Sequence, residues 1–155
     1  MGRPPWVEDE RSLRHKSTHG EVAVWFPAPL VIVYKYKGFA DASHARFIER
    51  TFDEAFGPDQ RHIHLFVDTE GQTGYDAEFR RATGARASRI QDRTDTYCLL
   101  VRSRIIALGI HVAAFAMGAP RANGLTGRIS AIADREVFRA RLEAAVRRSL
   151  ELAAR

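Results

Sequence analysis

Residues 62–81 read HIHLFVDTEGQTGYDAEFRR, and this stretch decides the fold that the rest of the chain must complete. From Ile63 to Val67 the side chains alternate as they do in a strand of a buried sheet. The apolar run stops at Asp68, passes two glycines and resumes at Asp76 with the spacing of a helix. Loops that leave the carboxyl end of a central strand usually carry the working surface of an α/β fold. The stretch therefore predicts strand, loop and helix, with a functional surface on the loop.

The segments on either side predict a sheet whose strands alternate with helices. Residues 21–26 and 30–37 are rich in Val, Ile and aromatic side chains and are separated by two prolines, which predicts a β-hairpin. Further strands are expected at 97–101 and 128–133, and helices at 41–56, 76–93, 105–119 and from Asp134 onward. Strands joined by helical crossovers pair in parallel. The order thus predicts an α/β fold, a mixed and mostly parallel sheet with an N-terminal β-hairpin and about four helices.

Length and composition favour one domain in a reducing compartment. The chain has 155 residues, of which 45% are hydrophobic, and this is enough to bury a substantial core. We expect residues 1–19, which are polar and charged, to be a disordered lead-in, and residues 20–155 to be a single domain. Cys98 is the only cysteine, so a disulfide framework is excluded and a cytoplasmic location is expected. No apolar segment has the length of about 18 residues that a membrane span needs.

The positive charge of the chain does not by itself indicate a nucleic-acid partner. Lys and Arg number 24 against 19 Asp and Glu, a net charge of +5. Nearly all the basic residues are arginines spread over the predicted helices, and those of the second helix, including Arg86, are expected largely to face water. No block of Lys and Arg with interleaved aromatic residues occurs. Nucleic-acid binding is therefore not expected.

The order of elements, the segment VDTEGQTGYD at residues 67–76 and the segment ADREVF at residues 133–138 resemble the STAS domain, in particular its SpoIIAA-like branch. This is the fold of bacterial anti-anti-sigma factors and of the cytoplasmic tails of sulphate transporters. The resemblance covers Gly20 to Arg148. It implies a cytoplasmic, non-catalytic regulatory or scaffold module that acts through protein–protein interaction. The implied partner is a kinase-like or anti-sigma-type regulator, no cofactor or metal is implied, and a homo-oligomer stays open.

The phosphorylation switch of that family has no matching hydroxyl here. In the family, an aspartate-led loop reaches a second aspartate and then a serine that a partner kinase phosphorylates. Asp68 and Asp76 match the two aspartates, whereas the serine positions fall on Ala77 and Glu78. Glu78 would imitate part of the charge of a phosphate. The simpler interpretation is that a glutamate in the first turn of a helix is stabilised by the helix dipole.

The predicted partner-binding surface combines the loop with the start of the second helix. Asp76 has the chemistry of a helix N-cap as well as that of a recognition residue. Tyr75 is an aromatic side chain in a polar, glycine-flanked loop, which suits partner contact. Thr69 and Thr73 are the candidate phosphoacceptors. The full set of predicted partner-binding residues is Asp68, Thr69, Glu70, Thr73, Tyr75, Asp76, Glu78 and Arg80.

The sequence also bears on metal binding, catalysis and the transport of a ligand. His62 and His64 have a spacing that can bind a metal, but no third ligand has an evident position, and a structural role is expected. The sequence has no phosphate loop, G-x-S-x-G elbow, H-E-x-x-H motif or paired cysteines, so an enzyme is not expected. The segment at 105–119, IIALGIHVAAFAMGA, is apolar on all sides, as a buried helix is. It could also contact a second copy, a partner or a lipid chain, so the alternative function is a carrier of a small apolar ligand or lipid.

Overall fold

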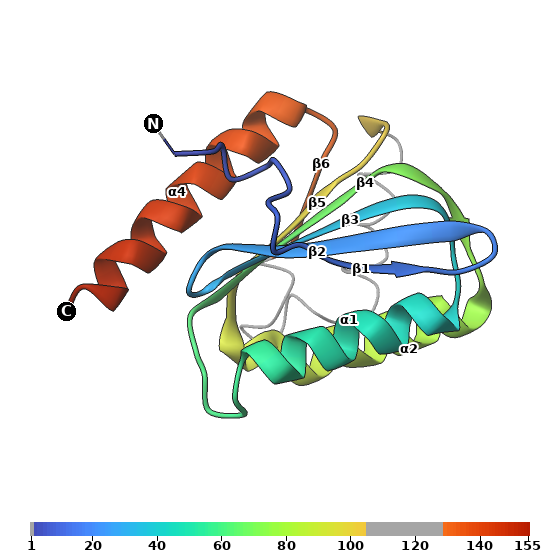
Figure 1. Cartoon of the computed structure of the whole chain (residues 1–155), viewed down its shortest axis with the longest axis horizontal. Helices are drawn as coiled ribbons and strands as arrows, with labels where there is room; N and C mark the ends of the chain where they lie inside the picture. The colour runs from blue at the N-terminus through green and yellow to red at the C-terminus, as the bar shows by residue number, and fades with distance from the viewer. Residues whose placement is uncertain (1, 105–128) are drawn as a thin grey trace.

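A computed structural model describes residues 2–104 and 129–155, which form one six-stranded mixed sheet with helices on both faces (Figure 1). The strands lie in sequence order across the sheet. They are β1 Leu13–Lys16, β2 Gly20–Ala28, β3 Val31–Ala40, β4 Ile63–Tyr75, β5 Thr94–Leu100 and β6 Ile129–Ile132. The helices are α1 Ala42–Ala55, α2 Ala77–Ile90 and α4 Arg135–Ala153, with a short 3-10 helix, η1, at Gln91–Arg93.

Strand pairing confirms the predicted fold class. β1, β2 and β3 are antiparallel neighbours, and β3, β4, β5 and β6 are parallel neighbours. The chain is therefore an α/β protein with a mixed sheet and an N-terminal hairpin, as expected from strands that alternate with helices. The described residues contain three α-helices. The helix predicted at 105–119 lies outside them.

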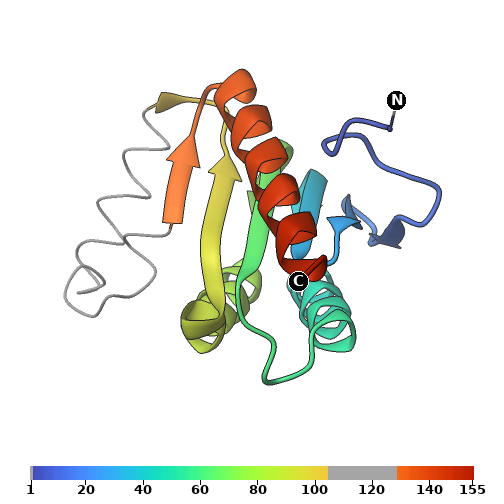
Figure 2. The same ribbon diagram turned by 90° about the vertical axis from the view of Figure 1, so that its left-hand side faces the viewer.

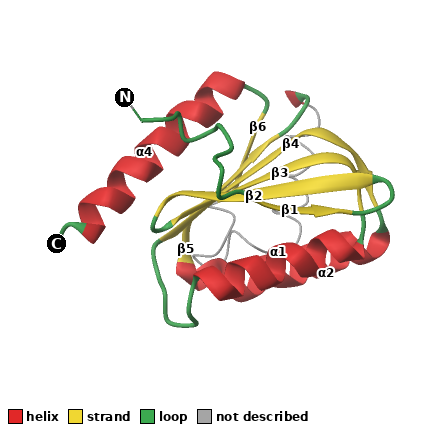
Figure 3. Ribbon diagram, viewed as in Figure 1, coloured by secondary structure: helices red, strands yellow, loops and turns green. Residues whose placement is uncertain are grey.

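The sheet separates α1 and α2 from α4 (Figures 2 and 3), and an apolar cluster lies on each of its two faces. α1 and α2 cover one face, where Tyr34, Leu65 and Val67 are part of the larger cluster. α4 lies across the opposite face, where Phe66 packs edge to face with Phe138 at a ring distance of 5.5 Å. Alternate residues of β4 thus enter different clusters, because successive side chains of a strand point to opposite faces.

Aspartates cap all three α-helices. Asp41 accepts a hydrogen bond from the Ser43 backbone, and Asp134 accepts from two backbone N–H groups of α4. Asp76 Oδ1 accepts from Phe79 N at 2.7 Å, which confirms its predicted role as an N-cap. Such a cap satisfies donors that the first helical turn leaves without partners.

The predicted loop at 68–75 is wrong, because β4 continues through it to Tyr75 and pairs with β3 along its length. Two register shifts bend this pair of strands. Gly71 permits the close approach, since a Cβ there would lie 2.8 Å from the carbonyl oxygen of Tyr36. Glycines that predict a loop in the sequence here serve a curved strand, as is common at bulges.

The expected disordered lead-in is also wrong for its second half. Leu13–Lys16 form β1, which pairs with β2 and adds an outer strand to the hairpin. The segment before it is tied down as well, because Trp25 Nε1 donates a hydrogen bond to the carbonyl of Pro5 at 2.9 Å. Of the helices that the structure describes, none combines the length and apolar character that a bilayer crossing requires.

Candidate functional site

A cleft of about 400 Å³ opens where β4 and β5 approach the first turn of α4. β5 ends at Leu100 beside Asp68, whereas β3 and β4 continue past this level and pair with each other as far as Ala40 and Tyr75. It is lined by Trp6, Lys35, Asp68, Glu70, Gly71, Leu100, Arg135, Phe138 and Arg139. Both signs of charge meet in this cleft, which we call the Asp68 cleft.

Asp68 is the half-buried carboxylate of the Asp68 cleft. It lies on the same face of β4 as Phe66 and opposite Lys35 of β3 in the strand register. Its Oδ1 accepts a hydrogen bond from Glu70 N at 3.0 Å. Among the described residues no cation lies within ion-pair distance of it. Burial, aided by the neighbouring Glu70 carboxylate, raises the pKa of Asp68, while Lys35 and Arg135 oppose this shift.

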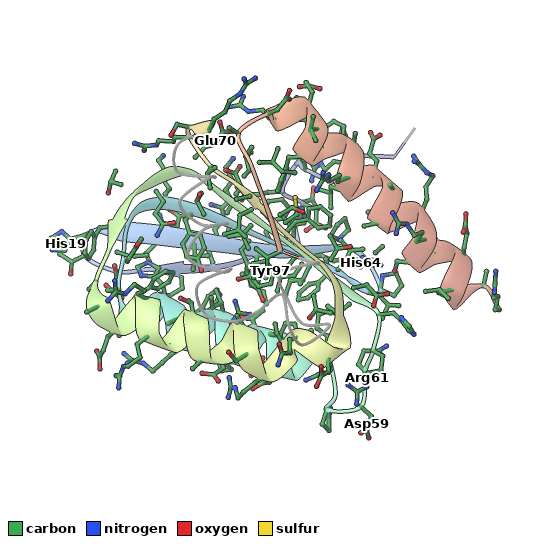
Figure 4. The ribbon with its side chains drawn as sticks, turned by 180° about the vertical axis from the view of Figure 1, so that it is seen from behind. His19, Asp59, Arg61, His64, Glu70 and Tyr97 are labelled. Atoms are coloured by element: carbon green, nitrogen blue, oxygen red, sulfur yellow. The ribbon has the colours of Figure 1, made fainter. Side chains whose placement is uncertain are left out.

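Glu70, labelled in Figure 4 near the start of α4, lines the cleft and is bonded to residues of two other segments. Its carboxylate Oε1 accepts from Arg135 Nε of α4 at 2.9 Å. Its backbone carbonyl accepts from Arg102 Nε at 2.7 Å, so β4 and the segment that follows β5 meet at one rim. These two hydrogen bonds link β4 to α4 and to the segment after β5, and Asp68 lies next to them in the lining of the cleft.

Seven of the nine residues that line the cleft were not predicted as site residues, among them Lys35, Arg135, Arg139 and Trp6. Lys35 interrupts the apolar run VIVYKYK, and a charged residue in a central strand was a usable signal. Arg135 and Arg139 are ordinary helix arginines in the sequence, and Trp6 was placed in the lead-in. In the structure the Arg139 guanidinium lies 5.1 Å from the centre of the Trp6 ring, so the N-terminal segment forms one wall of the cleft.

The predicted partner-binding residues fall into two groups along β4 and α2. Asp68 and Glu70 line the cleft, whereas Tyr75, Asp76, Glu78 and Arg80 lie at the start of α2. Seven residues of extended strand correspond to roughly 20 Å. Tyr75 is 53% exposed with its ring 6.1 Å from that of Phe79, and Glu78 is paired with Arg81 on the helix surface.

The two candidate phosphoacceptors differ in access. Thr69 is half-buried, and its hydroxyl donates a hydrogen bond to the Leu100 carbonyl at 2.8 Å, which ties β4 to β5. Thr73 is exposed in the curved part of β4. A kinase would therefore reach Thr73 more readily than Thr69.

The two histidines of the opening stretch lie in different surroundings. His62 precedes β4 and pairs with Asp95 at 2.9 Å from Nδ1 to Oδ2. His64 is buried, its Nδ1 lies 2.9 Å from the Thr96 hydroxyl, and burial lowers its pKa. The described ranges contain no cluster of three or more His, Cys, Asp and Glu side chains that could hold a metal ion.

Arg86 contradicts the expectation that the arginines of the second helix face water. Arg81 and Arg89 are exposed, but Arg86 is only 3% exposed and lies against the α1 and α2 face of the sheet. The helical pattern placed Thr83 and Ala87 on the inner side. The long Arg86 side chain shares that side, because residues three and four apart are neighbours on a helix.

The chain has an α/β fold of the SpoIIAA-like type. A solved structure similar to it is that of an uncharacterised protein of the DUF3478 family with a SpoIIAA-like fold, from Shewanella loihica PV-4. The TM-score is 0.58 at 10% sequence identity, and the match covers 84% of this chain and 91% of that chain. No protein-family model matches the sequence, and no curated protein matches it either. The likeness thus shows the fold.

Proposed function

We propose that this protein is a non-catalytic regulatory or scaffold module that binds another protein through the Asp68 cleft. The carrying observation is Asp68 itself, a half-buried carboxylate with a raised pKa and only one backbone donor among the described residues. A carboxylate held in this way lowers the stability of the fold, and perturbed groups in clefts mark functional sites.

The surroundings of Asp68 favour recognition over catalysis. The lining residues that the structure describes include no Ser, Thr, Cys or His that could act as a nucleophile or base beside it. The lining instead combines three cationic side chains and two carboxylates with the apolar side chains of Leu100 and Phe138. A partner that places a basic side chain or backbone N–H groups against Asp68 would complete its hydrogen bonding.

The test is affinity capture from a lysate of the native host, followed by direct binding of the recovered protein. Wild type is compared with Asp68→Asn, which keeps the shape of the side chain, and with Asp59→Asn, the same change in an exposed loop. A partner held by wild type and Asp59→Asn, and bound at least tenfold more weakly by Asp68→Asn, supports the proposal. Equal binding by all three removes the cleft from the interaction.

A Tyr75→Ala variant tests the second group of predicted residues in the same experiment. Because Tyr75 lies at the far end of the curved strand, a partner confined to the Asp68 cleft binds this variant as it binds wild type. Loss of binding by Tyr75→Ala alone would place the interaction at the start of α2 instead.

A further inference from the structure

Arg86 is a buried cation at the centre of the contact between α2 and the sheet. Only three of the fourteen residues of α2 are buried, namely Phe79, Arg86 and Ile90. The charged residue is therefore one of the few side chains that attach this helix. Lys and Arg are almost never fully buried unless they are paired.

The groups around the Arg86 guanidinium are aromatic and uncharged. Its Nη1 donates to the Tyr34 hydroxyl at a long 3.4 Å, and its central carbon lies 5.4 Å from the Tyr34 ring and 6.0 Å from the Phe52 ring. Tyr36 and Tyr97 are within electrostatic reach, and Figure 4 shows Tyr97 on β5, above α2. Burial raises the pKa of Tyr34 to about 12 and raises that of Tyr36 further, so both phenols are neutral at pH 7.

No acidic side chain compensates this charge. Among residues 2–104 and 129–155, no carboxylate forms an ion pair with Arg86, and its Nε–H has no hydrogen-bond partner there. The remaining stretch, 105–128, contains no Asp or Glu in its sequence. Within residues 2–104 and 129–155, the contacts of this guanidinium, which belongs to a residue 3% exposed, are the faces of two aromatic rings and one long hydroxyl contact.

Arg93, in the same region, is an arginine whose guanidinium has hydrogen-bond acceptors. Its guanidinium also lies over the Phe52 ring, at 5.4 Å. Unlike Arg86, it donates to backbone carbonyls, with Nη2 to Gly57 O at 2.6 Å and Nε to Gln60 O at 3.0 Å. Contact with Phe52 is thus common to both residues, and the missing acceptors are particular to Arg86.

We propose that Arg86 anchors a binding site for a small organic carboxylate with an aromatic or aliphatic body, between α2 and the sheet. A planar guanidinium binds a carboxylate through two parallel hydrogen bonds, and the Nε–H is one donor of such a pair. Tyrosine hydroxyls beside it are further donors. The surrounding cluster, which includes Leu65, Val67 and Phe79, suits an apolar body and disfavours a strongly hydrated inorganic anion.

Access to Arg86 requires α2 to separate locally from the sheet. Because few apolar side chains attach α2, such an opening costs less than unfolding of the core. The bound anion would then restore the attachment by pairing with Arg86. This site lies on the opposite face of the sheet from the Asp68 cleft, so the two proposals stand or fall separately.

The test measures thermal unfolding with benzoate, laurate and inorganic phosphate as separate probes. The proteins are wild type, Arg86→Met and, as a matched control, Arg81→Met on the exposed side of the same helix. We expect benzoate or laurate to raise the melting temperature of wild type and Arg81→Met in proportion to the logarithm of its concentration. To raise the melting temperature of Arg86→Met by the same amount, benzoate or laurate should be needed at a concentration at least tenfold higher than for wild type.

A second measurement needs no folded variant. In uniformly ¹³C- and ¹⁵N-labelled wild type, the Nε–H signal of Arg86, assigned through the resonances of its own side chain and backbone, should shift when benzoate or laurate is added. An unchanged signal together with no Arg86-dependent stabilisation by any probe would overturn the site. Stabilisation by phosphate alone would overturn the assignment to an organic carboxylate.

Discussion

Replacement of Asp68 by Asn should stabilise the protein while it weakens partner binding. The Asn side chain keeps the size of Asp68 and the oxygen that accepts from Glu70 N at 3.0 Å, and it removes the charge. Natural proteins retain such destabilising groups where function needs them. The substitution therefore distinguishes the effect of the Asp68 carboxylate on folding stability from its proposed role in partner binding.

The expected magnitude follows from two opposing contributions. Burial of a carboxylate without a counter-ion costs several kcal/mol. A hydrogen bond from a backbone N–H to the charged group returns about 1.5–3 kcal/mol, and partial exposure reduces the cost further. A net penalty of about 1 kcal/mol remains, so Asp68→Asn should raise the melting temperature by about 2–4 °C in a chain of this length.

The pH dependence has a definite sign. Because the pKa of Asp68 is raised above its ordinary value of 3.8, the folded state binds this proton more tightly than the unfolded state. The wild type thus loses stability as the pH rises from about 3.8 through the folded pKa, and the penalty is complete above it. The advantage of Asp68→Asn should be small near pH 3.8 and largest at pH 7.

Urea unfolding followed by far-ultraviolet circular dichroism at pH 4 and pH 7 measures this difference. Asp59→Asn, in an exposed loop, is the control and should change the free energy of unfolding by no more than about 0.5 kcal/mol at either pH. A loss of stability in Asp68→Asn at pH 7, or an equal gain at both pH values, would refute the reasoning about the Asp68 carboxylate.

Three further predictions concern the framework around the sites. Leu142 is fully buried between α4 and the sheet, so Leu142→Ala should lower the free energy of unfolding by about 2–5 kcal/mol in urea titrations, whereas Leu150→Ala, at a side chain 52% exposed, should cost less than about 1 kcal/mol. Burial lowers the pKa of His64, so below pH 6.5 the unfolded state binds a proton that the folded state does not, and the free energy of unfolding falls. His64→Gln should therefore lose less stability than wild type between pH 7 and pH 5, and an equal loss in both proteins would contradict this prediction. Gly84 lies in α2, and a Cβ added there would have no atom within 4 Å. Gly84→Ala should therefore raise the free energy of unfolding, measured by thermal unfolding, by about 0.5–1 kcal/mol, and a lower free energy of unfolding would contradict this prediction.

The sequence predicted the secondary structure correctly where interactions between residues close in the chain determine it. Alternation from Ile63 to Val67 predicts a strand whose side chains enter two clusters, and the structure shows both. Asp76 and Asp134 were recognised as N-caps because a short acceptor before a helical pattern satisfies the first N–H groups. That Asp68 and Arg102 lie near one rim of the sheet followed from the parallel order of the strands, whereas the start of α4 at this rim was not predicted.

The same local reasoning failed where distant segments meet. Residues 68–75 form a strand because β3 pairs with them, and glycine composition carries no information about that pairing. Leu13–Lys16 form β1 for the same reason, since β2 offers an edge that a polar segment can extend. Trp6 reaches the Asp68 cleft only because the N-terminal segment runs back toward α4 (Figure 1).

By itself, the sequence determined the α/β class, the hairpin, the parallel order of the later strands and the positions of the caps, because periodicity and short-range hydrogen bonding act over a few residues. Only the tertiary structure decided which charged side chains become buried and which of them become neighbours. Lys35 and Asp68 become neighbours through strand register, and Arg86 becomes buried because α2 turns that side chain toward Tyr34 and Phe52. Burial and pairing depend on contacts between segments far apart in the chain, and these contacts create the perturbed groups on which both proposed sites depend.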